Sequence, residues 1–152
     1  MALNFAEQAT KKIADIERPP LPPVGTYRWS ITKLPTQATS NDEKWDFLTF
    51  QCRALEAMED VDMDGYTGDV KNIILPLKFM FNKEDEAEFE KSLYRVRTFL
   101  EKHVKCAQEG DSIAQALNSS VNQQFLGSVV WNPGKNDPED LFANLVRTAP
   151  ID

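Results

Sequence analysis

A run of acidic residues at 60–69, DVDMDGYTGD, is the first stretch whose residue types and spacing could do chemistry. Asp60, Asp62 and Asp64 alternate and are followed by Gly65, as in the first half of an EF-hand calcium loop. The twelfth position of such a loop needs a bidentate glutamate, but here it is Lys71. The run is therefore predicted to be a solvated hairpin loop, in which Asp and Gly favour tight turns and no ion is needed.

Groups that could support catalysis are scarce. The chain has a single histidine, His103, and two cysteines, Cys52 and Cys106, which are too far apart in sequence for a zinc knuckle. The sequence contains no glycine-rich phosphate loop, nucleophile elbow or zinc-protease helix. His103 is expected at the rim of a helix, and Cys52 is expected as a buried, inert thiol. We therefore expect no enzymatic activity, no metal and no cofactor.

Aromatic and basic residues at alternate positions suggest a different chemistry. In WDFLTFQCRALEA (45–57), Trp45, Phe47 and Arg53 fall on one side of a predicted strand. A partly exposed aromatic pair beside a cation can stack bases and neutralise phosphates. If the strand is buried on both faces, or is covered by the N-terminal helix, the same aromatic rings belong to the core instead.

Length, composition and net charge indicate the class of protein that carries these side chains. The 152 residues, 41% hydrophobic and 27% charged, fit one compact domain beside a short N-terminal extension. We expect a cytoplasmic protein without a membrane partner, because no apolar run reaches the ~18 residues of a membrane span and the N-terminus lacks the apolar stretch of a signal peptide. The net charge of −7 argues mildly against non-specific attraction to nucleic acid, although a local basic patch can override it.

The N-terminal extension is predicted to comprise residues 1–24. Apolar residues at helical spacing behind the capping residue Asn4 predict an amphipathic helix over 5–17. The stretch RPPLPPVG (18–25) ends that helix and forms a stiff extended connector. A PxxP ligand is the alternative interpretation of the prolines.

The remaining residues, 25–152, are predicted to form one mainly β domain. Period-two alternation predicts strands over 26–33 and 45–57, and a third strand over 70–81 contains Pro76, which implies a sheet edge or a bulge. A helix capped by Asn82 is predicted over 83–106, with its acidic residues near the start and its basic residues in the second half. A shorter helix is predicted to start at Asp111 or Ser112.

Two further strands complete the predicted order. QFLGSVVW (124–131) has strand composition, and residues 138–148 fit either a helix or a closing strand, of which we favour the strand. The result is an α+β fold, an OB-like five-stranded antiparallel barrel with a helix between strands 3 and 4 and an N-terminal helical arm. Barrels of this order bind oligonucleotides or oligosaccharides on one face.

The patterns GTYRWSI at the first strand and FLGSVVWN with NLVRTAP at the end resemble small bacteriophage proteins of replication and recombination, which are similar to phage single-stranded DNA-binding proteins. The resemblance covers roughly residues 24–150 and rests on element order. It implies a non-catalytic single-stranded DNA-binding protein in the cytoplasm of the host cell. The chain departs from phage replicative binding proteins because it ends RTAPID and lacks their acidic tail.

In this interpretation bases stack on two aromatic side chains and phosphates meet four cations, and the candidate residues are Arg28, Lys33, Trp45, Phe47, Arg53 and Lys78. The alternative is a phage virion or scaffold protein, because an amphipathic arm on a proline spacer suits docking to a second copy or to another phage protein.

Overall fold

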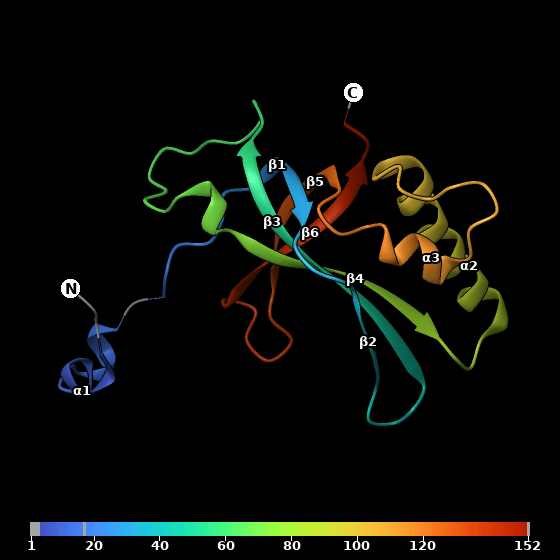
Figure 1. The fold of residues 1–152 in the computed structure, drawn as a ribbon. Coiled ribbons are helices and arrows are strands. Elements are labelled where there is room, and N and C mark those ends of the chain that lie inside the picture. Colours follow the sequence, from blue (N-terminus) through green and yellow to red (C-terminus); the bar gives the residue numbers. More distant parts are fainter. Residues whose placement is uncertain (1–3, 17, 152) are drawn as a thin grey trace.

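The fold is a six-stranded antiparallel sheet with a few helices packed on it (Figure 1). The structure is a computed structural model, and it describes residues 4–16 and 18–151. Strands β2, β3, β1, β5 and β6 are hydrogen-bonded in that order, and β4 pairs with the other edge of β3. The strands are β1 (Gly25–Ile31), β2 (Thr36–Thr39), β3 (Trp45–Ala57), β4 (Ile74–Asn82), β5 (Gln124–Pro133) and β6 (Leu141–Ala149).

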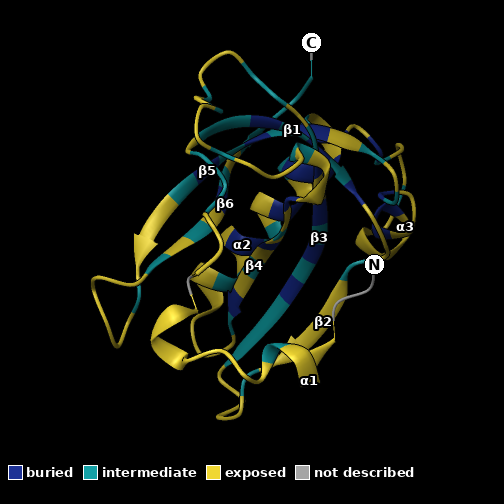
Figure 2. Ribbon diagram, turned by 90° about the vertical axis from the view of Figure 1, so that its left-hand side faces the viewer, coloured by how far each residue is buried: buried dark blue, intermediate teal, exposed yellow. Residues whose placement is uncertain are grey.

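The strands β1 and β3 confirm the predictions for 26–33 and 45–57. Alternate residues of β1 are buried, and in β3 Leu48, Phe50, Cys52 and Ala54 point into the core while their neighbours do not. Figure 2 shows this alternation of buried and half-buried positions along β3. The period of two therefore sets the two faces of the sheet.

The length of β3 lets it hold three partners. One edge of β3 pairs with β4 from Trp45 to Arg53, and the other pairs with β2 near its start and with β1 near its end. Strand β2 was not predicted, because its four residues are all exposed and show no apolar alternation. It lies between the strands predicted over 26–33 and 45–57, where no element was predicted.

The third predicted strand is shorter at its start than expected. Residues Val70–Asn72 form a 3-10 turn, η2, whose N-cap Asp69 accepts a hydrogen bond from the Lys71 amide at 3.0 Å. Strand β4 then begins at Ile74. Among the described strands β4 is hydrogen-bonded to β3 alone, so Pro76 lies on an edge strand as predicted.

The long helix differs from its predicted span of 83–106. Helix α2 runs over Glu86–Thr98 and continues as a π-helical turn, η3, over Phe99–His103. Its N-cap is Asp85, which accepts from the Glu88 amide, and not Asn82, which instead accepts from the Glu84 amide in the preceding turn. The acidic start and basic end of α2 are confirmed, as its dipole favours.

The shorter helix, α3 (Ile113–Asn118), begins where the sequence predicted. Ser112 is its N-cap and forms a capping box with Gln115: the Ser112 hydroxyl accepts from the Gln115 amide, and the Gln115 side chain accepts from the Ser112 amide. Ala116 and Leu117 of α3 are buried against the core.

The last segment forms a strand, as favoured, because β6 pairs with β5 over most of its length. The sheet is not closed into a barrel, so a closed five-stranded barrel is not confirmed. Within the described residues, β6 meets η3 at its C-terminal end: His103 Nδ1 lies 2.7 Å from Thr148 Oγ1. Arg147, at φ 53°, departs there from extended geometry. Among the described strands β6 is hydrogen-bonded to β5 alone, so the seam between β4 and β6 stays open.

The N-terminal helix is also shorter than predicted. Asn4 caps it as expected, but α1 spans only Phe5–Gln8, and a 3-10 turn, η1, follows at Ile13–Asp15. Position 17 of the predicted helix lies outside the described residues. A short helix without a packing partner has little stability in water, and neither α1 nor η1 buries a side chain.

In the described part of the chain, the helices all fall short of the length and apolar character that a membrane crossing requires.

Phe99 lies where the helical layer meets the sheet. Its ring packs against Phe50, Phe79 and Phe125 at centroid distances of 5.1, 5.6 and 5.1 Å, and it is fully buried. We predict that Phe99→Ala lowers the free energy of unfolding by about 3–5 kcal/mol, since it leaves a cavity that the rings cannot refill. Urea unfolding measures the loss. Tyr94→Ala, on the exposed side of α2, is the control and should change stability by no more than about 0.5 kcal/mol. Equal effects of the two variants would contradict this packing.

Candidate nucleic-acid interface

The sheet surface that faces away from the core is formed by alternate residues of β3 and β4. We call it the outer face, and it consists of Trp45, Phe47, Thr49, Gln51 and Arg53 on β3 and Ile74, Pro76, Lys78, Met80 and Asn82 on β4. These positions carry two cations and no carboxylate. A chain with a net charge of −7 therefore has a locally basic strip on its longest strand pair.

The aromatic pair of β3 is neither fully core nor fully exposed. Trp45 and Phe47 are both half-buried, and α1 projects away from the sheet and does not cover them (Figure 1). The ammonium group of Lys78 lies 5.2 Å from the centre of the Phe47 ring, within the range of a cation–π contact. The structure thus brings together two of the predicted residues that lie on different strands.

A shallow hollow lies farther along the same face. It has a volume of about 380 Å³, and it is lined by Lys33, Thr36, Thr49, Gln51, Ile74 and Pro76. Lys33 reaches it from the loop after β1. Arg53 is exposed one step beyond Gln51 on β3, where it pairs in register with Ser30 of β1.

Arg28 is set apart from the other predicted cations. Its Nη1 donates to Gln124 Oε1 at 3.0 Å, and its Nη2 lies 3.8 Å from a Glu56 carboxylate oxygen. The Arg28 Nε is buried and has no hydrogen-bond partner among the described residues. Because Glu56 offsets its charge, Arg28 contributes less to the basic strip than Arg53 or Lys78.

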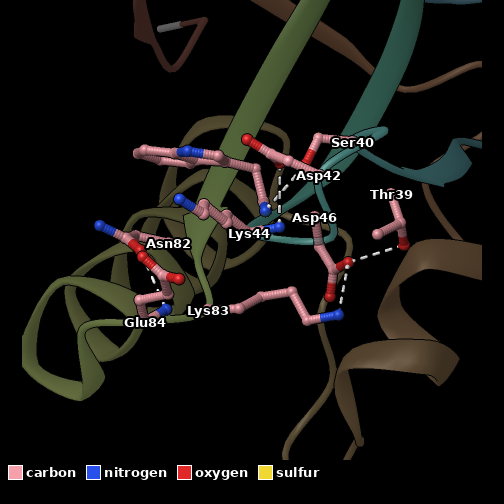
Figure 3. A network of polar contacts seen from close by, with 9 residues as sticks. Thr39, Ser40, Asp42, Lys44, Asp46, Asn82, Lys83 and Glu84 are labelled. Carbon is pink, nitrogen blue, oxygen red and sulfur yellow. Dashed lines mark hydrogen bonds and ion pairs between the residues drawn. The ribbon is translucent and has the colours of Figure 1, made fainter.

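A tight turn between β2 and β3 holds the start of β3 in place (Figure 3). The Ser40 amide donates to the Trp45 carbonyl at 2.8 Å, and the Trp45 amide donates to the Ser40 hydroxyl at 3.1 Å. The Ser40 hydroxyl also donates to Asp42, and this hydrogen bond, with one from the Lys44 amide, lowers the pKa of the Asp42 carboxyl. The turn therefore fixes the backbone that carries Trp45.

Two lysines beside this turn were not among the predicted site residues. The Lys83 amide donates to the Lys44 carbonyl at 2.8 Å, so the two residues are adjacent (Figure 3). The Lys83 ammonium group lies 3.5 Å from Asp46, while Lys44 is exposed. Only the pairing of β3 with β4 brings them together, and no sequence spacing indicates it.

Exposed apolar residues of β4 were also missed. Ile74 and Met80 are exposed and alternate with the buried Leu77 and Phe81. The strand over 70–81 was predicted without an assignment of its two faces, although a count of alternate positions separates them. These side chains add apolar surface beside Phe47.

The acidic loop is flanked by strand β3 and the turn η2, and not by the two helices of an EF-hand. Both carboxylate oxygens of Asp60 accept hydrogen bonds from Thr26, one from its amide at 3.0 Å and one from its hydroxyl at 2.9 Å. These bonds lower the pKa of Asp60. Among the described residues no group of three or more His, Cys, Asp or Glu side chains is placed to hold a metal ion. Asp60 thus ties the loop to β1.

The remaining candidate groups are buried or half-buried. Cys52 lies in the core as predicted, and burial raises the pKa of its thiol to about 12. His103 is half-buried beside Phe99, and desolvation lowers its pKa, so its ring is favoured in the neutral form. Neither group faces the outer face of the sheet.

No family model matches the sequence, and no curated protein matches it.

The two thiols provide a test of the packing behind the outer face. We predict that native protein reacts with Ellman's reagent far more slowly than unfolded protein, because Cys52 and Cys106 are buried and both have a raised pKa. At pH 8 a thiol with a pKa of about 12 is ionised in roughly one molecule in ten thousand. Rapid labelling of both cysteines in native protein would contradict the buried inner face of β3.

Proposed function

We propose that this chain is a non-catalytic single-stranded DNA-binding protein that acts in the replication or recombination of a bacteriophage. The observation that carries the proposal is the outer face of β3 and β4, where Phe47 lies under Lys78 and Trp45 and Arg53 share the same side of the strand. Half-exposed rings stack bases, and cations beside them neutralise phosphates.

We also propose that the sheet is an open variant of the OB fold. The order β4, β3, β1, β5, β6 follows that fold when β2 is treated as an insertion in the first loop. The connection between β4 and β5 carries the helix, and Cα atoms of β4 and β6 approach within 8 Å across the seam. In OB folds the second and third barrel strands carry the nucleic-acid face, and β3 and β4 are their equivalents here.

The form of the face favours single-stranded over double-stranded DNA. Stacking on Trp45 and Phe47 requires bases whose faces are free, which a duplex does not offer. From Trp45 to Arg53 the strand extends about 26 Å, at about 3.3 Å per residue. That length suits a site near the lower end of the range of about 4–16 nucleotides per OB fold.

Assembly is the second candidate function. The arm before the connector exposes three large apolar side chains, Phe5, Ile13 and Ile16, which favours docking to another protein surface. A virion or scaffold protein would use such an arm without any contact to DNA. The two functions are separated by a direct binding measurement.

Stacking is tested with a short labelled oligo-dT that one chain can cover. We predict that Phe47→Ala weakens binding by about 1–3 kcal/mol, or roughly 5-fold to 150-fold, because one base loses its stacking partner. Phe142→Ala is the matched control, since Phe142 is an exposed ring on β6. Fluorescence anisotropy measures both affinities. If the unmutated protein does not bind oligo-dT at low salt and micromolar concentration, the DNA proposal fails and the assembly function replaces it.

Phosphate contact is tested through salt dependence. We predict that Lys78→Ala and Arg53→Ala each lower the slope of log K against log salt by about 0.7, since each removes one neutralised phosphate of a single strand. Lys91→Ala is the control, because Lys91 lies on α2 and pairs with Glu88. Anisotropy titrations at several salt concentrations measure the slopes. If the slopes of both variants equal that of the unmutated protein, Lys78 and Arg53 do not contact phosphate.

A further inference from the structure

The N-terminal arm, residues 4–16, carries apolar side chains that the chain itself does not cover. Phe5, Ile13 and Ile16 are 85%, 89% and 62% exposed. Isolated exposed apolar residues are common, but three of them on one short segment that buries no side chain are not. The arm therefore has the composition of a segment that packs against something else.

The connector behind the arm is fixed to the body. The Trp131 indole donates to the Pro22 carbonyl at 2.8 Å, and the Tyr27 hydroxyl donates to the Pro23 carbonyl at 2.6 Å. Arg18 pairs with Asp140 and lies 5.1 Å from the centre of the Phe142 ring. The prolines stiffen this segment, so the connector sets the direction in which the arm leaves the body.

A groove lies on the opposite side of the molecule, between α2 and residues 107–116. We call it the helix groove; its volume is about 600 Å³, and its apolar lining includes Leu93, Tyr94, Leu100, Ala107, Ile113 and Ala116. Figure 1 shows α2 and α3 at one end of the molecule and the arm at the other. The arm thus points away from the groove of its own chain.

The lysines directly before Ile13 complement the charge of the helix groove. Glu90, Glu109 and Asp111 line the helix groove, and its one cation, Arg97, is already paired with Glu101 at 2.7 Å. The arm carries Lys11 and Lys12 directly before Ile13, while its two carboxylates, Glu7 and Asp15, are not adjacent to Ile13 in the sequence. An acidic groove with an apolar floor therefore matches a segment that presents lysines beside isoleucine.

We propose that the arm of one copy of this chain docks in the helix groove of a second copy. The contact is head-to-tail, because the two surfaces differ and lie at opposite ends of the molecule, so it leaves one arm and one groove free at the ends of each assembly. It does not depend on DNA binding. The contact is small, since it involves one short segment, and we expect association in the micromolar range.

The test is sedimentation equilibrium of the full chain without nucleic acid. Ile13→Asp removes the arm's apolar contact, and Ile113→Asp places a charge on the groove lining, where Ile113 is 42% exposed. Asp at the first position of α3 suits the helix dipole, so that variant should fold. Each variant is expected to weaken self-association roughly tenfold to a hundredfold, while Leu34→Asp, at an exposed position outside both surfaces, should not weaken it.

Mixing the two variants distinguishes this contact from a symmetric one. The Ile113→Asp chain keeps an intact arm and the Ile13→Asp chain keeps an intact groove, so the mixture should form one-to-one dimers that grow no further. Tyr94→Ala, at a position 61% exposed in the groove lining, is the second groove variant and should also weaken association. A monomeric unmutated chain, groove variants that associate normally, or a mixture without dimers would each overturn the proposal.

Discussion

The structure depends on the two-sided use of one long strand, β3. Its thirteen residues are hydrogen-bonded along both edges, and its alternation places Phe50 and Cys52 in the core and Phe47 and Arg53 on the opposite side. A shift of one residue in its pairing would exchange these two sets. The buried set therefore fixes the position of the exposed set, and the core determines the geometry of the candidate interface.

Charge distribution follows from the same arrangement. The chain as a whole is acidic, but its carboxylates gather in places such as the start of α2 and the loop after β3, where they cap a helix or tie down a loop. Asp60, for example, accepts both of its hydrogen bonds from Thr26. The positions that define the outer face carry two cations, Arg53 and Lys78, and no carboxylate. A net charge says little about such a surface.

The sequence predicted the elements whose pattern is local. Period-two alternation gives β3 its bounds and puts Trp45, Phe47 and Arg53 on one side, while capping chemistry gives the start of α3. Strand β2 has no such pattern because both of its faces are exposed.

The cap of α2 was assigned to Asn82 in place of Asp85, since both side chains accept amide hydrogen bonds just before the helix. The closed barrel is not confirmed, because among the described strands β6 pairs with β5 and not with β4, and no local pattern in the sequence specifies that pairing. The contact of Lys78 with Phe47 depends on the register of β4, which spacing in the sequence does not specify.

The central claim is that the outer face of β3 and β4 binds single-stranded DNA. The most direct measurement is a titration of isotopically labelled protein with oligo-dT, followed by two-dimensional amide NMR at low salt. We expect the largest shift changes in residues 45–53 and 74–82, and only small changes for the amides of α2 and α3. Shift changes centred on α2 and α3, or no changes at all, would contradict it.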